Sequence, residues 1–398
     1  MKYVFVHPDL GIGGAERLII DAAIGLQNEG HKVVMVTNQY SPSHCFKETE
    51  LLEIETVVDY IPRSILGKFH ALLAYLKIII AAIYVCVYHK DADVVISDQV
   101  SVGQIVLKPL SKARLIFYCH FPDLLLTDRK DAGKKVYRAF LDLLEAWSTG
   151  LADYICVNSE FTAGVVRETF PHLALRELVV LHPPLNMEFF DAIEVEKLSE
   201  DVVPTSANYI FTSVNRYEAK KRIDVAIEAF HHLKNKLSDE EFEKCHLVIA
   251  GGFDPRNGEN EDVLKKLVKL ADELDLPPSK ITFLKSPTDT EKINLIRSST
   301  AVLYTPDREH FGIVPIEAMY LGTPVIAVNS GGPKETVVPG KTGFLVEQTP
   351  DDFADAMVQL IRDSSLLETM SENGTKRVRQ NFGTKSFITK LIGCVENC

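Results

Sequence analysis

Two glutamates in residues 301–335 have the side chain and the spacing to accept hydrogen bonds on either side of a bound anion. Glu309 lies in a polar turn after an apolar run, and Glu317 lies in a short helical pattern with Pro315 in its first turn. The free amides and the positive dipole end of that turn favour a phosphate. Glu317 can accept two hydrogen bonds from a vicinal diol such as a ribose, and Glu309 can meet a second polyol. A phosphate flanked by two diols describes a sugar nucleotide.

Two cations in the second half of the chain are candidates to neutralise a diphosphate. Arg216 follows an apolar run at residues 209–214, and Lys221 comes five residues later, before a helical pattern. Arginine offers a planar fork to phosphate oxygens, and lysine offers a compact charge. The alternative is a plain charged surface, and Lys220 is the alternative cation if the register is one residue off.

A histidine and a glycine-rich turn follow two strand patterns in the first half. His120 comes after residues 115–119, so it would lie at the rim of a site at the carboxyl end of a parallel strand; the alternative is a histidine hydrogen-bonded only to structure. Gly13 and Gly14 follow residues 3–6 and open a helix. This turn is not a dinucleotide fingerprint, because Glu16 stands where the third small residue belongs. A nicotinamide or flavin enzyme is therefore disfavoured.

The elements that must position these residues alternate between strand and helix along both halves of the chain. A length of 398 residues predicts two domains, which we place at residues 1–190 and 205–380 with a linker between them. The alternation predicts an α/β fold with two Rossmann-like parallel sheets. Strands 301–304 and 325–328 flank the helix of Glu317, so both loops leave the carboxyl ends of neighbouring strands.

The overall composition excludes several classes of protein. The chain is 46% hydrophobic and 25% charged, as in ordinary globular proteins, and its net charge of -12 argues against a nucleic-acid binder. Its seven cysteines are scattered without a CxxC pair, which disfavours a disulfide framework and a structural zinc site. An Asp-x-Asp triplet does not follow any predicted strand, so we expect no metal.

Residues 69–88 form the most apolar stretch, interrupted by Lys77. Its length is near the lower limit for a membrane span. A strand pattern follows directly at residues 94–96, where a doubly wound domain needs a crossover helix. We therefore predict a buried or half-buried helix, with a membrane-contacting helix as the main alternative and a true span as the third. A second, basic amphipathic helix begins near Lys134 and Lys135, which suit either a solvated face or a lipid-headgroup or diphosphate contact.

The glutamate pair carries a resemblance to a known family. The chain resembles the retaining family-4 glycosyltransferases of GT-B fold, whose signature is two glutamates with seven residues between them, as in Glu309 and Glu317. The stretches HPDLGIGGAER, FYCHFPDLLLT, VNRYEAKKR, HFGIVPIEAMY and AVNSGGP are most similar to the dolichol-pathway α-1,3/1,6-mannosyltransferases. The resemblance covers the whole chain. It implies two Rossmann-like domains facing a central cleft, an N-terminal acceptor domain, a C-terminal donor domain and a C-terminal helix, in residues 381–398, that crosses back to the first domain.

The resemblance also implies a reaction. Mannose would pass from GDP-mannose to a dolichyl-diphosphate-linked oligosaccharide, first Man1GlcNAc2 and then Man2GlcNAc2, with retention of the α configuration. The leaving diphosphate would take the acceptor proton, without a cofactor. The place would be the cytosolic face of the endoplasmic reticulum membrane, where other dolichol-pathway glycosyltransferases are further candidate partners. The alternatives are another donor or acceptor, a GT-B phosphorylase or epimerase, and a non-catalytic sugar-nucleotide-binding scaffold.

The roles implied for single residues follow the family's motifs. Glu317 would hold the ribose, Glu309 the mannose hydroxyls, and His120 would brace the mannose. The predicted catalytic residues are His120, Glu309, Arg216 and Lys221. The predicted donor-binding residues are Gly13, Gly14, Arg216, Lys221, Glu309, Phe311, Gly312, Ile313, Val314 and Glu317. The predicted acceptor-binding residues are His120, Asp123, Lys134 and Lys135.

Overall fold

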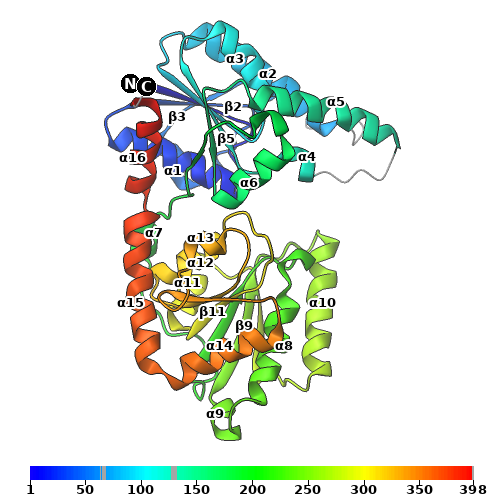
Figure 1. The fold of residues 1–398 in the computed structure, drawn as a ribbon, viewed down its shortest axis with the longest axis vertical. Coiled ribbons are helices and arrows are strands. Elements are labelled where there is room, and N and C mark those ends of the chain that lie inside the picture. Colours follow the sequence, from blue (N-terminus) through cyan, green and yellow to red (C-terminus); the bar gives the residue numbers. More distant parts are fainter. Residues whose placement is uncertain (63, 65–68, 127–131, 397–398) are drawn as a thin grey trace. The chain divides into compact units, whose positions relative to one another are not determined.

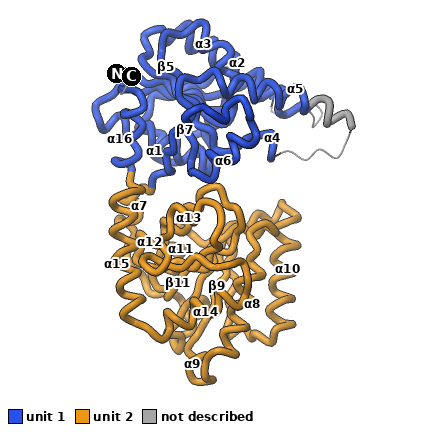
Figure 2. The backbone as a smooth tube through the Cα atoms, viewed as in Figure 1, with its two compact units in different colours: residues 1–184, 384–398 blue, residues 185–383 orange. Residues whose placement is uncertain are grey.

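The chain folds into two compact units (Figure 2). The computed structural model describes residues 1–62, 64, 69–126 and 132–396, apart from the side chains of residue 126 and residues 132–137. Unit 1 comprises Met1–Pro184 and Thr384–Cys398, and unit 2 comprises Leu185–Gly383. The chain therefore leaves unit 1 once and returns to it.

Unit 1 is built on a parallel sheet that includes β2, β3 and β5, which are labelled in Figure 1. The sheet has seven strands in the order β3-β2-β1-β4-β5-β6-β7. Its strands are β1 Lys2–His7, β2 Lys32–Thr37, β3 Glu53–Thr56, β4 Val94–Asp98, β5 Arg114–Cys119, β6 Tyr154–Val157 and β7 Leu178–Val180. In the register, Val4 of β1 lies opposite Val34 on one side and Val95 on the other. These strands read as near-continuous Val and Ile runs because helices cover both faces of the sheet.

Alternate residues of β1 supply two separate cores. Tyr3 and Phe5 belong to the cluster under α1 and α16, whereas Val4 and Val6 belong to the cluster under α2, α3 and α5. This follows from the period of two in a strand. The helices of unit 1 are α1 Gly14–Asn28, α2 His70–Tyr88, α3 Gln104–Leu110, α4 Asp123–Leu126, α5 Ala132–Thr149, α6 Glu160–Thr169 and α16 Thr384–Glu396.

The predicted return of the C-terminal helix to the first domain is confirmed. Phe387, Ile388 and Leu391 of α16 are buried in the same cluster as the inner face of α1. Gly25 of α1 permits this contact, because a β-carbon there would collide with the side chain of Ile388. The helix therefore belongs to the core of unit 1.

Unit 2 is built on a six-stranded parallel sheet with the order β10-β9-β8-β11-β12-β13. Its strands are β8 Tyr209–Val214, β9 Cys245–Gly251, β10 Ile281–Lys285, β11 Ala301–Tyr304, β12 Val325–Val328 and β13 Gly343–Val346. Its helices are α7 Met187–Ala192, α8 Ile223–Lys234, α9 Asp239–Glu243, α10 Gly258–Glu273, α11 Asp289–Ser298, α12 Ile313–Tyr320, α13 Pro333–Thr336, α14 Pro350–Arg362 and α15 Ser364–Asn381. The two predicted Rossmann-like sheets are thus confirmed.

Both sheets reverse their strand order at one point. In unit 1 the order runs outward from β1 to β2 in one direction and from β4 to β5 in the other. In unit 2 the same reversal lies between β8 and β11. Open α/β sheets bind ligands outside the carboxyl ends of the strands at such a switch point. Ligand-binding residues are therefore expected after β1, β4 and β5 in unit 1 and after β8 and β11 in unit 2.

The boundary between the units lies at Pro184 and Leu185, not at residue 190 as predicted. The predicted linker, which ran to residue 205, is part of unit 2. Leu185 and Phe190 are buried in a core cluster with Phe382, and the Leu185 amide donates a hydrogen bond to the Phe382 carbonyl at 2.7 Å. The chain re-enters unit 1 at Thr384, not at residue 381. This segment lacks strand periodicity because it packs as the short helix α7 and irregular chain.

The apolar stretch at residues 69–88 forms α2, as predicted, and one side of it is buried. Its inner face, including Leu73, Ile78 and Val85, packs on the sheet, whereas Leu76 and Val87 are exposed. Among the described residues, α2 is the one helix long and apolar enough to cross a membrane, judged by length and composition alone. The prediction of a half-buried crossover helix is confirmed.

Candidate active site

Glu309 lies in the loop between β11 and α12 and forms an ion pair with Lys221. The Lys221 ammonium group contacts Oε2 of Glu309, and both side chains are largely buried. Burial alone would raise the pKa of Glu309, but the charge and the hydrogen bond of Lys221 bring it below its ordinary value. Glu309 is therefore a carboxylate near neutral pH, with oxygens able to accept hydrogen bonds from hydroxyl groups.

Lys221, and not its neighbour Lys220, faces this loop. Lys220 is 69% exposed at its side chain and lies 3.3 Å from Glu218, as measured between Nζ and Oε2. Arg216, the other predicted cation, is 63% exposed and forms a 2.9 Å ion pair with the same Glu218. The structure thus places Lys221 beside Glu309 and leaves Arg216 at the surface beyond the end of β8.

Glu317 is buried in the second turn of α12, with a side chain that is only half satisfied. Only 8% of the surface of Glu317 is exposed to solvent. Oε1 accepts a hydrogen bond from Lys292 of α11 at 3.2 Å, and Oε2 has no hydrogen-bond partner among the residues that the structure describes. Burial raises the pKa of Glu317, and the charge of Lys292 offsets part of that rise. A buried acceptor without a partner carries a free-energy cost that a ligand donor would remove.

Two glycines after β12 hold the Glu309 loop in place. Gly331 has a φ of +60°, and the Gly332 amide donates a hydrogen bond to the Glu309 carbonyl at 2.8 Å. A β-carbon on Gly331 would collide with the backbone of Glu309, and one on Gly332 would collide with the backbone of Phe311. The Gly-Gly-Pro loop therefore fixes the height of Glu309 above the sheet.

The remaining predicted donor residues form the turn that opens α12. Gly312 is the N-terminal cap residue with a φ of +83°, and no side chain caps the helix. A β-carbon at Gly312 would press on the ring of Tyr304. Phe311 is buried, whereas Ile313 and Val314 are partly exposed. The first amides of α12 are therefore presented by a backbone conformation that favours glycine.

In unit 1, His120 belongs to a line of titratable groups that sequence reasoning did not find. His120 follows β5, and its Nε2 lies 2.9 Å from Oδ2 of Asp98, the last residue of β4. Oδ1 of Asp98 lies 2.7 Å from Nδ1 of His7, the last residue of β1. Nε2 of His7 lies 3.8 Å from Oε1 of Glu16 in the first turn of α1. The sequence signal was available, because β1 ends on His7, β4 ends on Asp98, and His120 directly follows β5.

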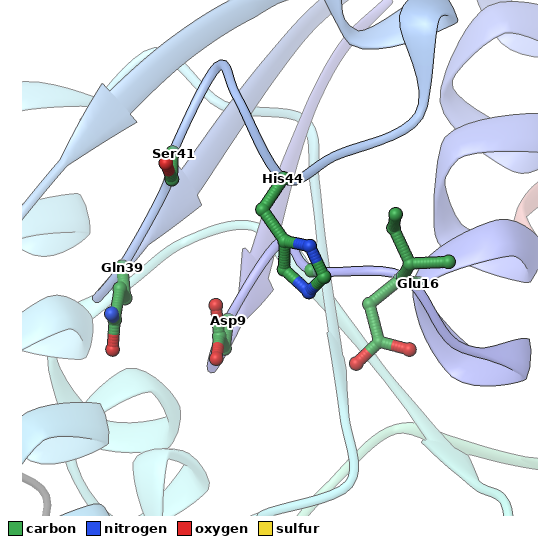
Figure 3. A pocket seen from close by; sticks show the side chains of 7 residues that line it. Asp9, Glu16, Gln39, Ser41 and His44 are labelled. Carbon is green, nitrogen blue, oxygen red and sulfur yellow. The ribbon is translucent and has the colours of Figure 1, made fainter. Parts of the chain in front are cut away.

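The glycine-rich turn before α1 is folded against a carboxylate. A β-carbon at Gly13 would collide with Glu16, whereas the space around Gly14 is open. Beside this turn, a pocket is lined by Asp9, Gly11, Ile12, Glu16, Gln39, Ser41 and His44. Figure 3 shows Glu16 on the helix and Gln39, Ser41 and His44 on the segment that follows β2. The polar lining suits a hydroxyl-rich ligand more than an anion, because it includes two acidic residues.

The other predicted acceptor residues are only partly described. Asp123 begins α4, and its carboxylate accepts a hydrogen bond from Arg138 of α5 at 2.8 Å. Its amide donates to Glu145 at 2.7 Å, and burial raises the pKa of Glu145 to about 7. Asp123 therefore joins α4 to α5. The side chains of Lys134 and Lys135 lie outside the described residues.

Comparisons with known proteins agree with this arrangement of two units. Residues 12–189 match the family model described as Glycosyltransferase Family 4, and residues 194–377 match Glycosyl transferases group 1. The chain is 46% identical to the alpha-1,3/1,6-mannosyltransferase ALG2 of Mus musculus over 392 residues, which cover 98% of this chain and 94% of that protein. The chain belongs to the glycosyltransferase family of these alpha-1,3/1,6-mannosyltransferases. It is therefore an enzyme, a hexosyltransferase, as predicted.

Other relatives and solved structures extend the comparison. ALG2 of Homo sapiens is 45% identical over 98% of this chain and 94% of its own length. ALG2 of Saccharomyces cerevisiae is 37% identical over 98% of this chain and 84% of its own length. Sucrose-phosphate synthase from Thermosynechococcus elongatus matches with a TM-score of 0.74 at 19% identity, covering 100% of this chain and 99% of that one. Anabaena HepE in complex with UDP matches with a TM-score of 0.72 at 17% identity, covering 100% of both chains. These likenesses show the GT-B fold.

Proposed function

We propose that this enzyme transfers mannose from GDP-mannose to a dolichyl-diphosphate-linked oligosaccharide, forming α-1,3 and α-1,6 linkages during assembly of the N-glycan precursor. The names of its relatives give the sugar and the linkages. The observation that carries a nucleotide-sugar donor is the constellation of Glu309, Glu317 and Lys221 at the switch point of unit 2.

In this proposal each of the three groups receives one part of the donor. The unpartnered Oε2 of Glu317 accepts hydrogen bonds from the ribose diol. Lys221 and the first amides of α12 neutralise the diphosphate, with Arg216 reaching it from the surface. Glu309 accepts hydrogen bonds from the mannose hydroxyls. The Lys221–Glu309 ion pair opens when the diphosphate arrives, because both anions compete for the same ammonium group.

Transfer proceeds with retention, and the leaving diphosphate accepts the proton of the acceptor hydroxyl. Developing negative charge on the leaving group needs positive groups or dipoles placed beforehand. Lys221, Arg216 and the N-terminus of α12 supply them, so we propose that the enzyme works without a divalent metal. Groups of His, Cys, Asp and Glu suited to hold a metal ion are absent from the part of the chain that the structure describes.

A lipid-linked acceptor requires the enzyme to work at a membrane, which we place at the cytosolic face of the endoplasmic reticulum. Two helices of unit 1 support this location with exposed apolar residues at helical spacing. On α2 these are Leu72, Leu76, Ile83 and Val87, and on α5 they are Phe140, Leu143 and Trp147. The two helices contribute Tyr75 and Leu141 to one core cluster, so they are neighbours in unit 1.

A transfer assay with purified enzyme and a short-lipid acceptor tests the proposal. GDP-mannose should support transfer and UDP-sugars should not. Glu309→Gln should abolish most turnover, whereas Glu240→Gln, an exposed glutamate on α9 of the same unit, should leave it unchanged. Efficient transfer from a UDP-sugar in place of GDP-mannose would overturn the choice of donor.

We further propose that one active site forms both linkages, because the described residues hold one Glu309–Glu317 constellation. The acceptor for each linkage is supplied separately to Glu309→Gln protein. Both products should be lost together. If one linkage forms at the wild-type rate while the other is lost, a second site or binding mode exists.

A further inference from the structure

The least expected feature of unit 1 is the line of groups that joins His7 to His120 through Asp98. His7 is completely buried and Asp98 is 1% exposed, yet both are polar and lie at the carboxyl ends of adjacent strands. A structural core gains little from such a pair, because their mutual hydrogen bond does no more than offset the free-energy cost of burying two polar side chains. Asp98 contacts His120 directly and His7 lies one contact further away, so their place at the switch point suggests a role in the reaction.

The contact between Asp98 and His120 determines which nitrogen of His120 carries a proton. A carboxylate can only accept hydrogen bonds, so Nε2 of His120, 2.9 Å from Oδ2 of Asp98, must be the protonated nitrogen. This leaves Nδ1 as the imidazole nitrogen for the substrate. The side chain of Asn158 donates to the His120 carbonyl at 3.0 Å and fixes the backbone at the same point. Both the tautomer and the position of His120 are thus set by neighbours.

His7 supplies the positive charge that balances Asp98. Burial alone would lower the pKa of His7, but the charge of Asp98 and their 2.7 Å contact raise it to about 10. The same positive charge and the hydrogen bonds of both histidines hold the pKa of Asp98 below its usual value despite its burial. The other groups facing this line are Glu16 and Tyr118, whose ring centroid lies 4.8 Å from that of His120. Burial keeps the pKa of Tyr118 well above its ordinary range, so Tyr118 is neutral.

We propose that His7 is a positioning residue for glycosyl transfer: through Asp98 it holds the imidazole of His120 in one tautomer and one position for the reaction. The proposal rests on the proposed function, together with the role that the family resemblance implies for His120, that of bracing the mannose. The positive charge of His7 weakens the attraction of Asp98 for the proton on Nε2 of His120. Without the charge of His7, the Asp98 carboxylate has lost the group that balances it and attracts the proton on Nε2 of His120 more strongly.

The experiment compares His7→Gln with His89→Gln as a matched control. His89 is also a buried histidine of unit 1, and its Nε2 lies 2.7 Å from a carboxylate oxygen of Glu55. In the transfer assay, His7→Gln should lower kcat by about 10- to 100-fold, the cost of a misplaced catalytic group, with the KM for GDP-mannose unchanged. His89→Gln should leave kcat unchanged. If His7 served only the fold, both variants would lose stability, and the kcat of the folded protein would stay unchanged in both.

A second measurement follows His120 directly and does not depend on activity. In protein labelled with ¹⁵N at histidine, the His120 signal is assigned by its loss in His120→Asn. The wild type should show the Nε2-protonated tautomer, and the His120 signals should shift in His7→Gln, because the charge that balances Asp98 is then missing. Asp98→Asn should mix the two tautomers.

The outcomes separate this inference from the proposed function. An unchanged kcat in folded His7→Gln protein, or His120 signals identical to those of the wild type in that variant, would overturn the positioning role. A wild-type enzyme that transfers no mannose from GDP-mannose would overturn the proposed function, whereas the coupling of His7 to His120 would still be visible in the spectra. If His7→Gln does not fold, Asp98→Asn carries the same test, and a single unmixed tautomer there would contradict the inference.

Discussion

Replacing Glu317 by glutamine should separate donor affinity from fold stability. The substitution keeps the shape of the side chain and removes the negative charge that faces Lys292 and, in our proposal, the ribose diol. Hydrogen bonds to a charged group contribute about 1.5–3 kcal/mol. Losing them should raise the Kd for GDP and for GDP-mannose roughly ten- to 150-fold, since about 1.4 kcal/mol corresponds to a factor of ten.

The same change should not destabilise the folded enzyme. Burial raises the pKa of Glu317 above its unfolded value, so the folded state binds this proton more tightly than the unfolded state does. The corresponding stability is present below the unfolded pKa and is lost as the pH rises through the folded pKa. At neutral pH the buried carboxylate therefore costs stability. Glu317→Gln should leave the Tm unchanged or raise it, while donor affinity falls.

Calorimetric titration with GDP and GDP-mannose, beside thermal unfolding without ligand, measures both effects. Glu309→Gln is the control in the same loop: it should reduce turnover while GDP affinity stays equal or increases, because it frees Lys221 for the diphosphate. Wild-type GDP affinity in Glu317→Gln would refute the ribose assignment. A Tm several degrees lower would instead show that Glu317 serves the fold.

Three further predictions follow from the same contacts. Lys221→Ala should remove most activity, with little rescue by Mg²⁺. As the pH is lowered, the residual activity should be lost at a higher pH than in the wild type, because the pKa of Glu309 rises without Lys221. A pH–rate profile identical to that of the wild type would contradict this. Turnover on a soluble short-lipid acceptor should persist in excess EDTA, and strict loss restored by Mg²⁺ or Mn²⁺ would show that a metal takes the place of Lys221. The double variant Leu76→Ser and Trp147→Ser should sediment less with phospholipid vesicles than Leu175→Ser, which alters an exposed apolar residue elsewhere in unit 1; equal sedimentation would assign membrane binding to other residues.

Local patterns predicted most of the elements and the neighbourhood of Glu309 and Glu317. Strand periodicity, glycine turns and the spacing of the two glutamates are properties of short segments, and so they can be read from a sequence. Lys292 was missed because it reaches Glu317 from another helix, and a lysine in an amphipathic pattern carries no local signal. The roles given to these residues in binding and transfer stay predictions.

Contacts between distant segments explain the other differences. His7 and Asp98 are 91 residues apart and meet only because β1 and β4 are neighbours, which follows from the sheet order and not from either strand alone. The unit boundary was misplaced for the same reason: Leu185 finds its partner at Phe382. A pattern of apolar residues predicts that a segment is buried, but it does not say against which segment.

In the sequence, unit 2 is inserted between the two segments of unit 1, and its first and last residues are neighbours in space. Its first residue, Leu185, forms a β-bridge with its last, Gly383. The two boundaries of unit 2 are therefore far apart in sequence but lie at one place in space. The first and last residues of unit 2 are already joined by this bridge. We therefore expect that the half of the enzyme that carries Glu309 and Glu317 folds as a module when it is expressed or circularly permuted at these ends. In our proposal, this would allow donor recognition to be measured apart from acceptor recognition.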